Sequence, residues 1–225
     1  MILKPGAALL FDIDGTLADT DPLHLKAFNA AFAPFGHVID EHRYAKEIQG
    51  HANVAIAARF VPHLPPEEGM RVLDGKEILF RELAGTDIMP VPGLFELLEM
   101  ADRIGLPMAA VTNAPRANAD LIIDSLGIRH RFKAVVIGAE LAHGKPHPLP
   151  YLEGLRLLGA DAAASVAFED SRTGIASATA AGIATVGIRT SLLHEDMIAA
   201  GAVLSADSYD APAVHAFIAA RVAAT

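Results

Sequence analysis

The sequence predicts an α/β protein: a mostly parallel, doubly wound sheet with a second, helical domain inserted after the first strand. Two patterns lead to this prediction. Short apolar runs alternate with helical patterns over most of the 225 residues, and such alternation is typical of a parallel sheet covered by helices on both faces. The alternation fails once, between about residues 17 and 86, where helical patterns follow one another without a strand.

Five apolar runs predict buried strands, and each is followed by polar or glycine-bearing residues. They are Ala7–Phe11, Met108–Val111, Ala134–Ile137, Ser165–Phe168 and Ala184–Ile188. Helical periodicity covers most of the sequence that separates or follows them, at Leu94–Ile104, Ala117–Leu126, Leu149–Leu158, Gly174–Ala181 and Pro212–Ala223. The strands therefore connect through helices, as a doubly wound sheet requires.

The segment without strands predicts a helical cap domain. Its helical patterns are Pro22–Phe35, Val54–Phe60 and Pro66–Leu83, and Gly85–Gly93, with Pro90 and Pro92, is interpreted as the linker back to the sheet. We therefore assign residues 18–86 to the cap and residues 1–17 and 87–225 to the core. Such an insert would lie above the carboxyl ends of the strands, where ligands bind in open α/β sheets.

Composition narrows the classes of partner. Apolar residues make up 52% of the chain, and the net charge is −9 with 27 acidic and 18 basic residues. No block of Lys or Arg is present, which argues against a nucleic-acid or anionic-membrane partner. The chain has no cysteine, and no apolar run is long enough for a signal-peptide core or a membrane span. We expect a cytoplasmic protein that is a monomer or a weak homo-oligomer.

Two carboxylates, Asp12 and Asp14, follow the first predicted strand in the sequence Phe11-Asp12-Ile13-Asp14-Gly15. Strand periodicity places both on one side. Neighbouring buried carboxylates repel each other and lose hydration, so a divalent cation is the usual compensation. A turn with Asp14-Gly15 at its corner is the alternative for these residues alone.

Polar residues also follow three later strands. Thr112-Asn113 ends the second, Lys145 lies on the loop after the third, and Glu169-Asp170 closes the fourth. Each has an ordinary alternative: a turn, a solvated lysine and a helix N-cap. However, the carboxyl ends of parallel strands share one edge of a sheet, where α/β proteins place their sites, so we expect one common site.

The charges at this edge predict a metal. Asp12, Asp14, Glu169 and Asp170 contribute four negative charges, and Mg²⁺ with Lys145 would return three positive ones. A phosphate dianion would therefore enter only with the metal bound and with Asp14 protonated at times. Mn²⁺ could substitute for Mg²⁺ in the same oxygen shell.

Taken in order, these residues resemble the four-motif signature of the haloacid dehalogenase superfamily: Asp12-x-Asp14-Gly15-Thr16, Thr112-Asn113, Lys145-Pro146 and Glu169-Asp170. The resemblance covers essentially the whole chain. The helical segment resembles the small cap of the branch that contains β-phosphoglucomutases and phosphoglycolate phosphatases. This resemblance implies a Mg²⁺-dependent phosphatase that acts on a small phosphorylated metabolite, either a sugar phosphate or a phosphoglycolate-like ester.

The resemblance also implies roles for the site residues. Asp12 would be the nucleophile that becomes transiently phosphorylated. Asp14 would protonate the leaving alcohol and then deprotonate water, a task that suits a carboxyl whose pKa is raised by its neighbour. The metal would be held by Asp12, the Asp14 backbone carbonyl and Asp170, supported by Glu169, and the phosphoryl oxygens by Thr112, Asn113 and Lys145.

Three further residues are weaker candidates for contact with substrate. His24 and Lys76, on the first and last predicted cap helices, match positions that face the substrate in the β-phosphoglucomutase branch. Asn118 is a similar candidate. The alternatives are a solvated helix face for the first two and a polar residue at a helix start for Asn118. Asp21 is instead interpreted as a helix N-cap before Pro22, outside the site.

Alternative functions remain open at this point. Haloacid dehalogenases lack the second acid of the first motif, so Asp14 argues against dehalogenation. A phosphosugar mutase would share all four motifs, but mutases usually have an arginine where this chain has Asn53, and Val or Ile in place of Thr16. Loss of a guanidinium weakens the grip on a second phosphate and favours hydrolysis. A non-catalytic binding protein with this fold is the second alternative.

Overall fold

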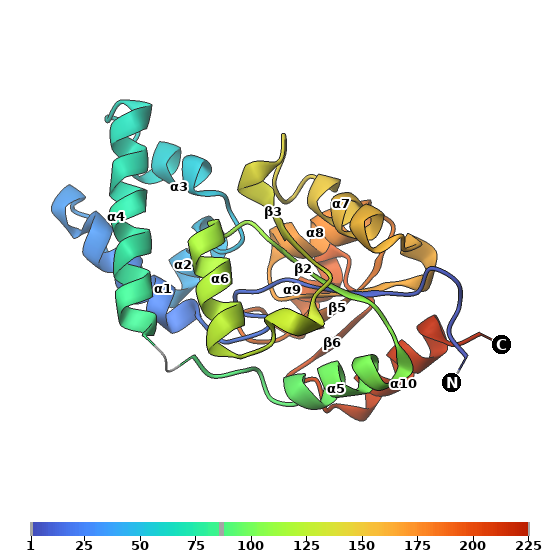
Figure 1. Cartoon of the computed structure of the whole chain (residues 1–225). Helices are drawn as coiled ribbons and strands as arrows, with labels where there is room; N and C mark the ends of the chain where they lie inside the picture. Colours follow the sequence, from blue (N-terminus) through green and yellow to red (C-terminus); the bar gives the residue numbers. More distant parts are fainter. Residues whose placement is uncertain (1, 86–87, 225) are drawn as a thin grey trace.

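Six parallel strands form the central sheet of the computed structural model, which describes residues 2–85 and 88–224 (Figure 1). They lie in the order β3-β2-β1-β4-β5-β6, and each pair of neighbouring strands is parallel. The strands are β1 (Leu9–Phe11), β2 (Met108–Thr112), β3 (Ala134–Ile137), β4 (Val166–Glu169), β5 (Ala184–Ile188) and β6 (Leu204–Ala206). The chain runs outward from β1 on one side and from β4 on the other, so the predicted doubly wound sheet is confirmed.

Helices cover both faces of the sheet because alternate strand residues point to opposite sides. In β1, Leu9 and Phe11 belong to one buried cluster, and Leu10 belongs to a second. The first cluster is covered by α5 (Leu94–Ile104), α6 (Arg116–Ser125) and α10 (Pro212–Val222), and the second by α7 (Leu149–Leu158) and α8 (Arg172–Ala180). Figure 1 shows α5 and α10 below the sheet and α7 and α8 above it.

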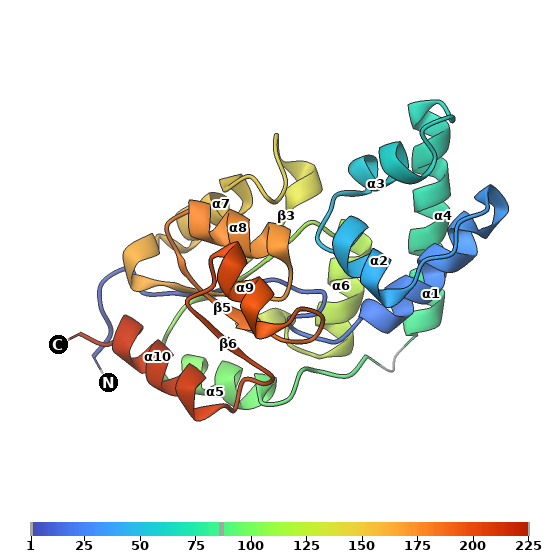
Figure 2. The same ribbon diagram turned by 180° about the vertical axis from the view of Figure 1, so that it is seen from behind.

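Four helices between β1 and β2 form what we call the helical insert. They are α1 (Asp21–Phe32), α2 (Glu41–Glu47), α3 (Asn53–Phe60) and α4 (Pro66–Ala84). The insert has its own buried cluster, in which the rings of Phe32 and Phe60 stack with centroids 4.9 Å apart. Both views place it at one side of the sheet, beside α6 (Figure 2). The predicted helical module after the first strand is therefore present.

The ends of the insert lie side by side on the core. The Val91 N–H donates to the Leu17 carbonyl at 3.0 Å, and Ala18 forms an isolated bridge with Pro90. The predicted domain boundary between residues 86 and 87 falls outside the described residues. The division into two domains therefore stays a prediction.

The predicted elements agree with the structure within two residues for all five strands. One predicted helix is present but too long: Pro22–Phe35 ends as α1 at Phe32 and continues only as a 3₁₀ turn, Ala33–Phe35. Pro34 lacks the N–H that an α-helix needs there. The sequence analysis also missed α2, α9 (His194–Ala200) and β6. These are short elements, of seven, seven and three residues, and offer little periodicity to detect.

The helices are also informative about membranes. Within residues 2–85 and 88–224, every helix is too short or too polar to cross a bilayer.

Candidate active site

The carboxyl ends of β1 and β4 meet where the strand order reverses, which is where α/β sheets of this topology bind ligands. Asp12 directly follows β1, and Glu169 is the last residue of β4. The register pairs Phe11 with Phe168, and the Asp12 N–H donates to the Phe168 carbonyl at 3.0 Å. The backbone therefore fixes Asp12 beside Glu169 without any help from side chains.

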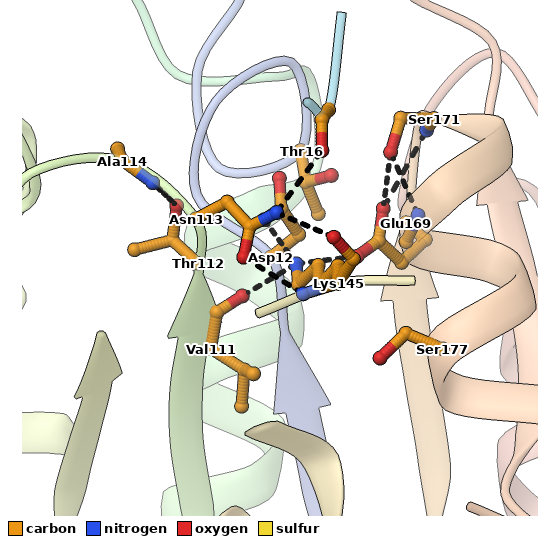
Figure 3. Close-up of polar contacts among 12 residues, drawn as sticks. Asp12, Thr16, Val111, Thr112, Asn113, Ala114, Lys145, Glu169, Ser171 and Ser177 are labelled. Carbon is orange, nitrogen blue, oxygen red and sulfur yellow. Dashed lines mark hydrogen bonds and ion pairs between the residues drawn. The ribbon is translucent and has the colours of Figure 1, made fainter. Parts of the chain in front are cut away.

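Lys145 links these two carboxylates. Its Nζ donates to Asp12 Oδ1 at 2.5 Å, to Glu169 Oε1 at 2.6 Å and to the Val111 carbonyl at 2.7 Å (Figure 3). Lys145 is 5% exposed, and an ammonium group has three protons. Each proton thus has a partner, and the lysine holds the Asp12 carboxylate in one orientation.

The backbone of Lys145 is itself held by Asn113. The Asn113 side chain accepts from the Lys145 N–H at 2.9 Å and donates to the Lys145 carbonyl at 3.0 Å. Its amide nitrogen also donates to the Gly50 carbonyl in the insert at 3.1 Å. Thr112, next to it, accepts from the Ala114 N–H at 2.9 Å. Both predicted phosphate ligands line the pocket, and the Asn113 amide already orients Lys145.

The electrostatics of the cluster are unbalanced. Burial raises the pKa of Asp12 to about 8, with further increases from Glu169 and Asp14, against the opposing charge of Lys145. Burial likewise raises the pKa of Asp170 well above its usual value, helped by the charges of Asp12 and other carboxylates. For Lys145, burial alone would lower the pKa, but Asp12 and Glu169 raise it overall. One lysine is therefore too little positive charge for this cluster.

Three buried carboxylates could hold a metal ion. Asp12, Glu169 and Asp170 each offer an oxygen, and these oxygens lie within 4.8 Å of one another. An all-oxygen donor set with excess negative charge fits a hard divalent cation such as Mg²⁺. Gly15, at φ +72°, makes room for this arrangement, because a Cβ there would lie 2.2 Å from Asp170 Oδ2. The residues present thus fit the predicted cation.

Glu169 is the most constrained of the three. It is fully buried, and Oε1 accepts from Tyr151 as well as from Lys145, at 2.7 Å and 2.6 Å. A Cβ on Gly174 would lie 2.0 Å from its carboxyl carbon. This packing suits a supporting role beside the metal, as the sequence analysis predicted for Glu169.

Asp14 faces the insert. Its Oδ1 accepts from Thr20 Oγ1 at 2.8 Å and contacts His24 Nε2 at 2.9 Å. Burial alone would raise the pKa of Asp14, but the hydrogen bonds from His24 and Thr20 and the nearby charge of Lys76 hold the pKa below its usual value. The expectation of a raised pKa is therefore wrong for this arrangement, because it considered only the neighbouring carboxylate.

His24 continues into a polar chain along the insert. Lys76 Nζ lies 2.8 Å from His24 Nδ1. An ammonium group can only donate, so Nδ1 accepts and the ring proton sits on Nε2, directed at Asp14. Lys76 also donates to Glu77 at 3.0 Å, and Asn118 Nδ2 donates to the same Glu77 oxygen at 2.6 Å. The three weaker candidates, His24, Lys76 and Asn118, thus lie in one connected network.

The sequence analysis missed Gln49 and Glu77 and excluded Asp21, yet all three line the pocket. Asp21 is not the N-cap, which is Thr20; its carboxylate instead accepts from Tyr44 at 2.8 Å and from Gln49 at 2.9 Å. Gln49 Nε2 also donates to Asp170 Oδ2 at 2.7 Å. Glu77 could have been suspected because it directly follows Lys76, which the sequence suggests as a substrate contact. No sequence pattern points to Gln49.

The insert docks on the core through the loop at Gly50. The Gly50 carbonyl accepts from Asn113 and from Thr173 Oγ1, at 3.1 Å and 2.9 Å. A Cβ on Gly50 would lie 2.1 Å from Thr173 Oγ1 and 2.7 Å from Ser171 Oγ, and φ is +71°. Only glycine fits this approach. Residues of the docked insert and of the core together line one pocket.

Comparisons with known proteins agree with this geometry. The sequence model described as haloacid dehalogenase-like hydrolase matches residues 9–188. The protein CbbY of Cupriavidus necator is 37% identical over 206 residues, covering 84% of this chain and 80% of CbbY. An N-acetylmuramic acid 6-phosphate phosphatase of Pseudomonas aeruginosa is 32% identical over 194 residues, covering 84% of each chain.

A solved structure extends the likeness to three dimensions. A CbbY variant from Rhodobacter sphaeroides in complex with xylulose-1,5-bisphosphate superposes with a TM-score of 0.78 at 29% identity, covering 94% of this chain and 96% of CbbY. The matched residues 9–188 include all four motifs, from Asp12 to Asp170. The chain therefore belongs to the haloacid dehalogenase-like hydrolase family.

Proposed function

We propose that this protein hydrolyses small phosphomonoesters in two steps, with Asp12 as the nucleophile and Mg²⁺ as the cofactor. The observation that carries the proposal is the setting of Asp12, whose Oδ1 lies 2.5 Å from Lys145 Nζ inside a buried cluster with Glu169 and Asp170. A lysine that fixes one oxygen of a carboxylate orients the other for attack on phosphorus.

The cation would be held by Asp12 and Asp170, with the backbone carbonyl of Asp14 as a further ligand and Glu169 in support. Mn²⁺ would suit the same oxygen donors. When bound, the cation would offset the carboxylate charge and stabilise negative charge on the phosphoryl oxygens. Thr112, Asn113 and Lys145 are proposed to bind the phosphoryl group from the core side.

In the first step, an Asp12 oxygen forms a bond to phosphorus as the ester bond breaks, and the leaving oxygen takes a proton from Asp14. In the second step, water attacks phosphorus and gives a proton to Asp14, and the bond from phosphorus to Asp12 breaks. Atoms and charges balance, and both carboxyl groups return to their starting state.

His24 supports the proton transfers at Asp14. Its Nε2–H points at Asp14 Oδ1 across 2.9 Å, and Lys76 can return a proton at Nδ1 across 2.8 Å. The low pKa of Asp14 favours a resting carboxylate. Asp14 would therefore take a proton from the pair of His24 and Lys76 before the ester bond breaks, and the proton that water gives to Asp14 in the second step would return to this pair.

The insert is proposed to act as a cap domain, residues 18–86, over a core of residues 1–17 and 87–225. Its Gly50 loop reaches the core and its α4 contributes Lys76 and Glu77 to the pocket. The leaving group of a small substrate would lie in the pocket that the insert and the core line together. The relative named for N-acetylmuramic acid 6-phosphate and the neighbour with xylulose-1,5-bisphosphate support a phosphorylated carbohydrate.

The proposal is tested by phosphate release from a panel of phosphorylated sugars and short acids, with and without Mg²⁺, for three variants. Asp12→Asn should abolish turnover and Asp14→Asn should slow both steps. Asp19→Asn, at an exposed position of the same segment, is the matched control and should not change the rate. Mass spectrometry after rapid quenching should find the phosphoryl group on Asp12.

Two outcomes would contradict the proposal. Undiminished phosphate release by folded Asp12→Asn would remove Asp12 as the nucleophile. Conversion of β-glucose 1-phosphate to glucose 6-phosphate without phosphate release would make the protein a mutase instead, and turnover of no ester would favour the non-catalytic alternative.

A further inference from the structure

The insert contributes a negative charge to the pocket wall. Glu77, on α4, is 5% exposed and lines the pocket. Burial alone would raise its pKa, but the charge of Lys76 and the hydrogen bonds from Asn53 and Lys76 hold the pKa below its usual value. Glu77 is therefore ionised at neutral pH, and any leaving group that reaches this wall meets a carboxylate.

The donors around Glu77 are fixed. Asn53 Nδ2 donates to Oε1 at 2.7 Å, and Lys76 Nζ and Asn118 Nδ2 donate to Oε2 at 3.0 Å and 2.6 Å. The Asn118 oxygen accepts from Arg81 at 2.8 Å, which fixes which end of the amide faces Glu77. A carboxylate has about four acceptor positions, so these three donors leave room for about one hydroxyl from a ligand.

The cations that line the pocket are already engaged. The three protons of Lys76 have Glu77, His24 Nδ1 and the face of the Phe28 ring as partners, the last with its centroid 4.1 Å from Nζ. Lys145 is saturated in the same way by the core. Among the described residues that line the pocket, none is an arginine. A second phosphate would thus have to displace an existing ion pair.

The charge balance points the same way. Five carboxylates and two lysines line the pocket, and a Mg²⁺ ion would leave a net charge of about −1 before any phosphate enters. The phosphoryl group to be transferred has its own ligands at Asp12. A second phosphate carries about −1.5 to −2 more, and burying it beside Glu77 without a free cation is costly.

We propose that Glu77 is a specificity-determining residue that selects monophosphates whose leaving group is uncharged and rich in hydroxyls, such as sugar and polyol phosphates. Esters with a second phosphate or a carboxylate at the Glu77 wall are rejected by like-charge repulsion. In this respect the chain would differ from the CbbY neighbour that binds xylulose-1,5-bisphosphate and from the relative named for N-acetylmuramic acid 6-phosphate. A hydroxyl donates to the remaining acceptor position of Glu77, and because the hydroxyl is uncharged, the ionised carboxylate does not repel it. This inference rests on the proposed phosphatase function and narrows its substrate class.

Matched substrates test the inference on the unmutated protein. Fructose 1-phosphate is compared with fructose 1,6-bisphosphate, and glycerol 3-phosphate with 3-phosphoglycerate, so that within each pair only one group changes charge. The uncharged member should have the higher kcat/KM by about 10- to 100-fold, because juxtaposed like charges cost several kcal/mol. Equal or reversed preference in both pairs would overturn the inference while leaving the phosphatase function intact.

A variant then assigns the preference to Glu77. Glu77→Gln keeps the shape and removes the charge, so kcat/KM for the charged members should rise, chiefly through KM, and the ratio should fall toward one. Glu82→Gln removes the same charge from an exposed position of α4 and should leave the ratio unchanged. A folded Glu77→Gln protein with an unchanged ratio would refute the role of Glu77. Failure of the unmutated protein to release phosphate from any ester would refute the phosphatase function itself.

Discussion

Replacing Gly50 by alanine should weaken docking of the insert on the core by more than it weakens the fold itself. The loop at Gly50 is one of the places where the insert contacts the core, here through two hydrogen bonds to one carbonyl. Alanine there must adopt φ near +71° and place its Cβ 2.1 Å from Thr173 Oγ1. The left-handed conformation is unfavourable for alanine, and the overlap with Thr173 cannot be accommodated while the loop keeps its present position, so we expect the loop to move away from the core.

The magnitude follows from two contributions. The left-handed conformation costs an alanine roughly 1–2 kcal/mol. Separation of the loop from Asn113 and Thr173 loses two hydrogen bonds, each worth about 0.5–1.5 kcal/mol. The docked state should therefore lose about 2–5 kcal/mol relative to the undocked one, and since about 1.4 kcal/mol is a factor of ten, the ratio of docked to undocked protein should fall at least roughly 30-fold.

Gly36→Ala is the matched control. Gly36 lies in the same insert at φ +78°, and nothing lies within 4 Å of its added Cβ. Gly36→Ala should therefore be destabilised only by the left-handed conformation, which lowers Tm by roughly 2–8 °C for a chain of this size. Its kcat/KM should stay unchanged. Thr173→Ala combined with Gly50→Ala removes the closest contact and should restore part of the activity.

Two assays read the result. Phosphate release gives kcat/KM, and hydrogen exchange of the backbone from residue 48 to 53 reports directly on docking. Gly50→Ala should exchange faster there than either the unmutated protein or Gly36→Ala. If Gly50→Ala and Gly36→Ala were indistinguishable in both assays, the close approach at Gly50 would have no role in docking and the reasoning would fail.

Three more predictions concern the buried carboxylates. Gly174→Ala, whose Cβ would lie 2.0 Å from the Glu169 carboxyl carbon, should displace that carboxylate and lower kcat by about 100-fold, whereas Gly75→Ala, with open space around its Cβ, should leave kcat unchanged. Tyr151→Phe removes a 2.7 Å hydrogen bond to Glu169 worth roughly 1.5–3 kcal/mol, so thermal scanning should show Tm lower by roughly 3–12 °C; an unchanged Tm would mean that water replaces the hydroxyl. Glu77 has a folded pKa below its usual value of 4.5, so its contribution to stability is present above about pH 4.5 and is lost as pH falls further. Urea midpoints of Glu77→Gln should accordingly depend less on pH in this acidic range than those of the unmutated protein.

The core of the site was predictable because it depends on strand ends. Asp12, Lys145 and Glu169 are separated by up to 157 residues, yet each follows a strand of one parallel sheet, and parallel strands bring their carboxyl ends to one edge. The short apolar runs that predict those strands are strong local signals. Sequence position therefore translated into spatial proximity without any knowledge of side-chain contacts.

The insert's contribution was not predictable in the same way. Gln49 reaches Asp170 across 121 positions, and Asn118 reaches Glu77 across 41. Both contacts depend on how the insert docks, which no local pattern specifies. The lowered pKa of Asp14 was not predictable for the same reason. The sequence suggests His24 only as a substrate contact, and the hydrogen bond between His24 and Asp14 depends on where helix α1 lies in the docked insert.

The two connections to the insert lie one hydrogen bond apart, from the Val91 N–H to the Leu17 carbonyl. A loop whose ends already meet can change in length at little entropic cost, because closure entropy grows only slowly with the number of residues. Exchange of everything between those two points would leave Asp12, Lys145 and Glu169 in place on the sheet but would replace His24, the partner of Asp14. A graft of another insert at Leu17 and Val91 could therefore change the substrate and keep the reaction only if the new insert also supplies a partner for Asp14.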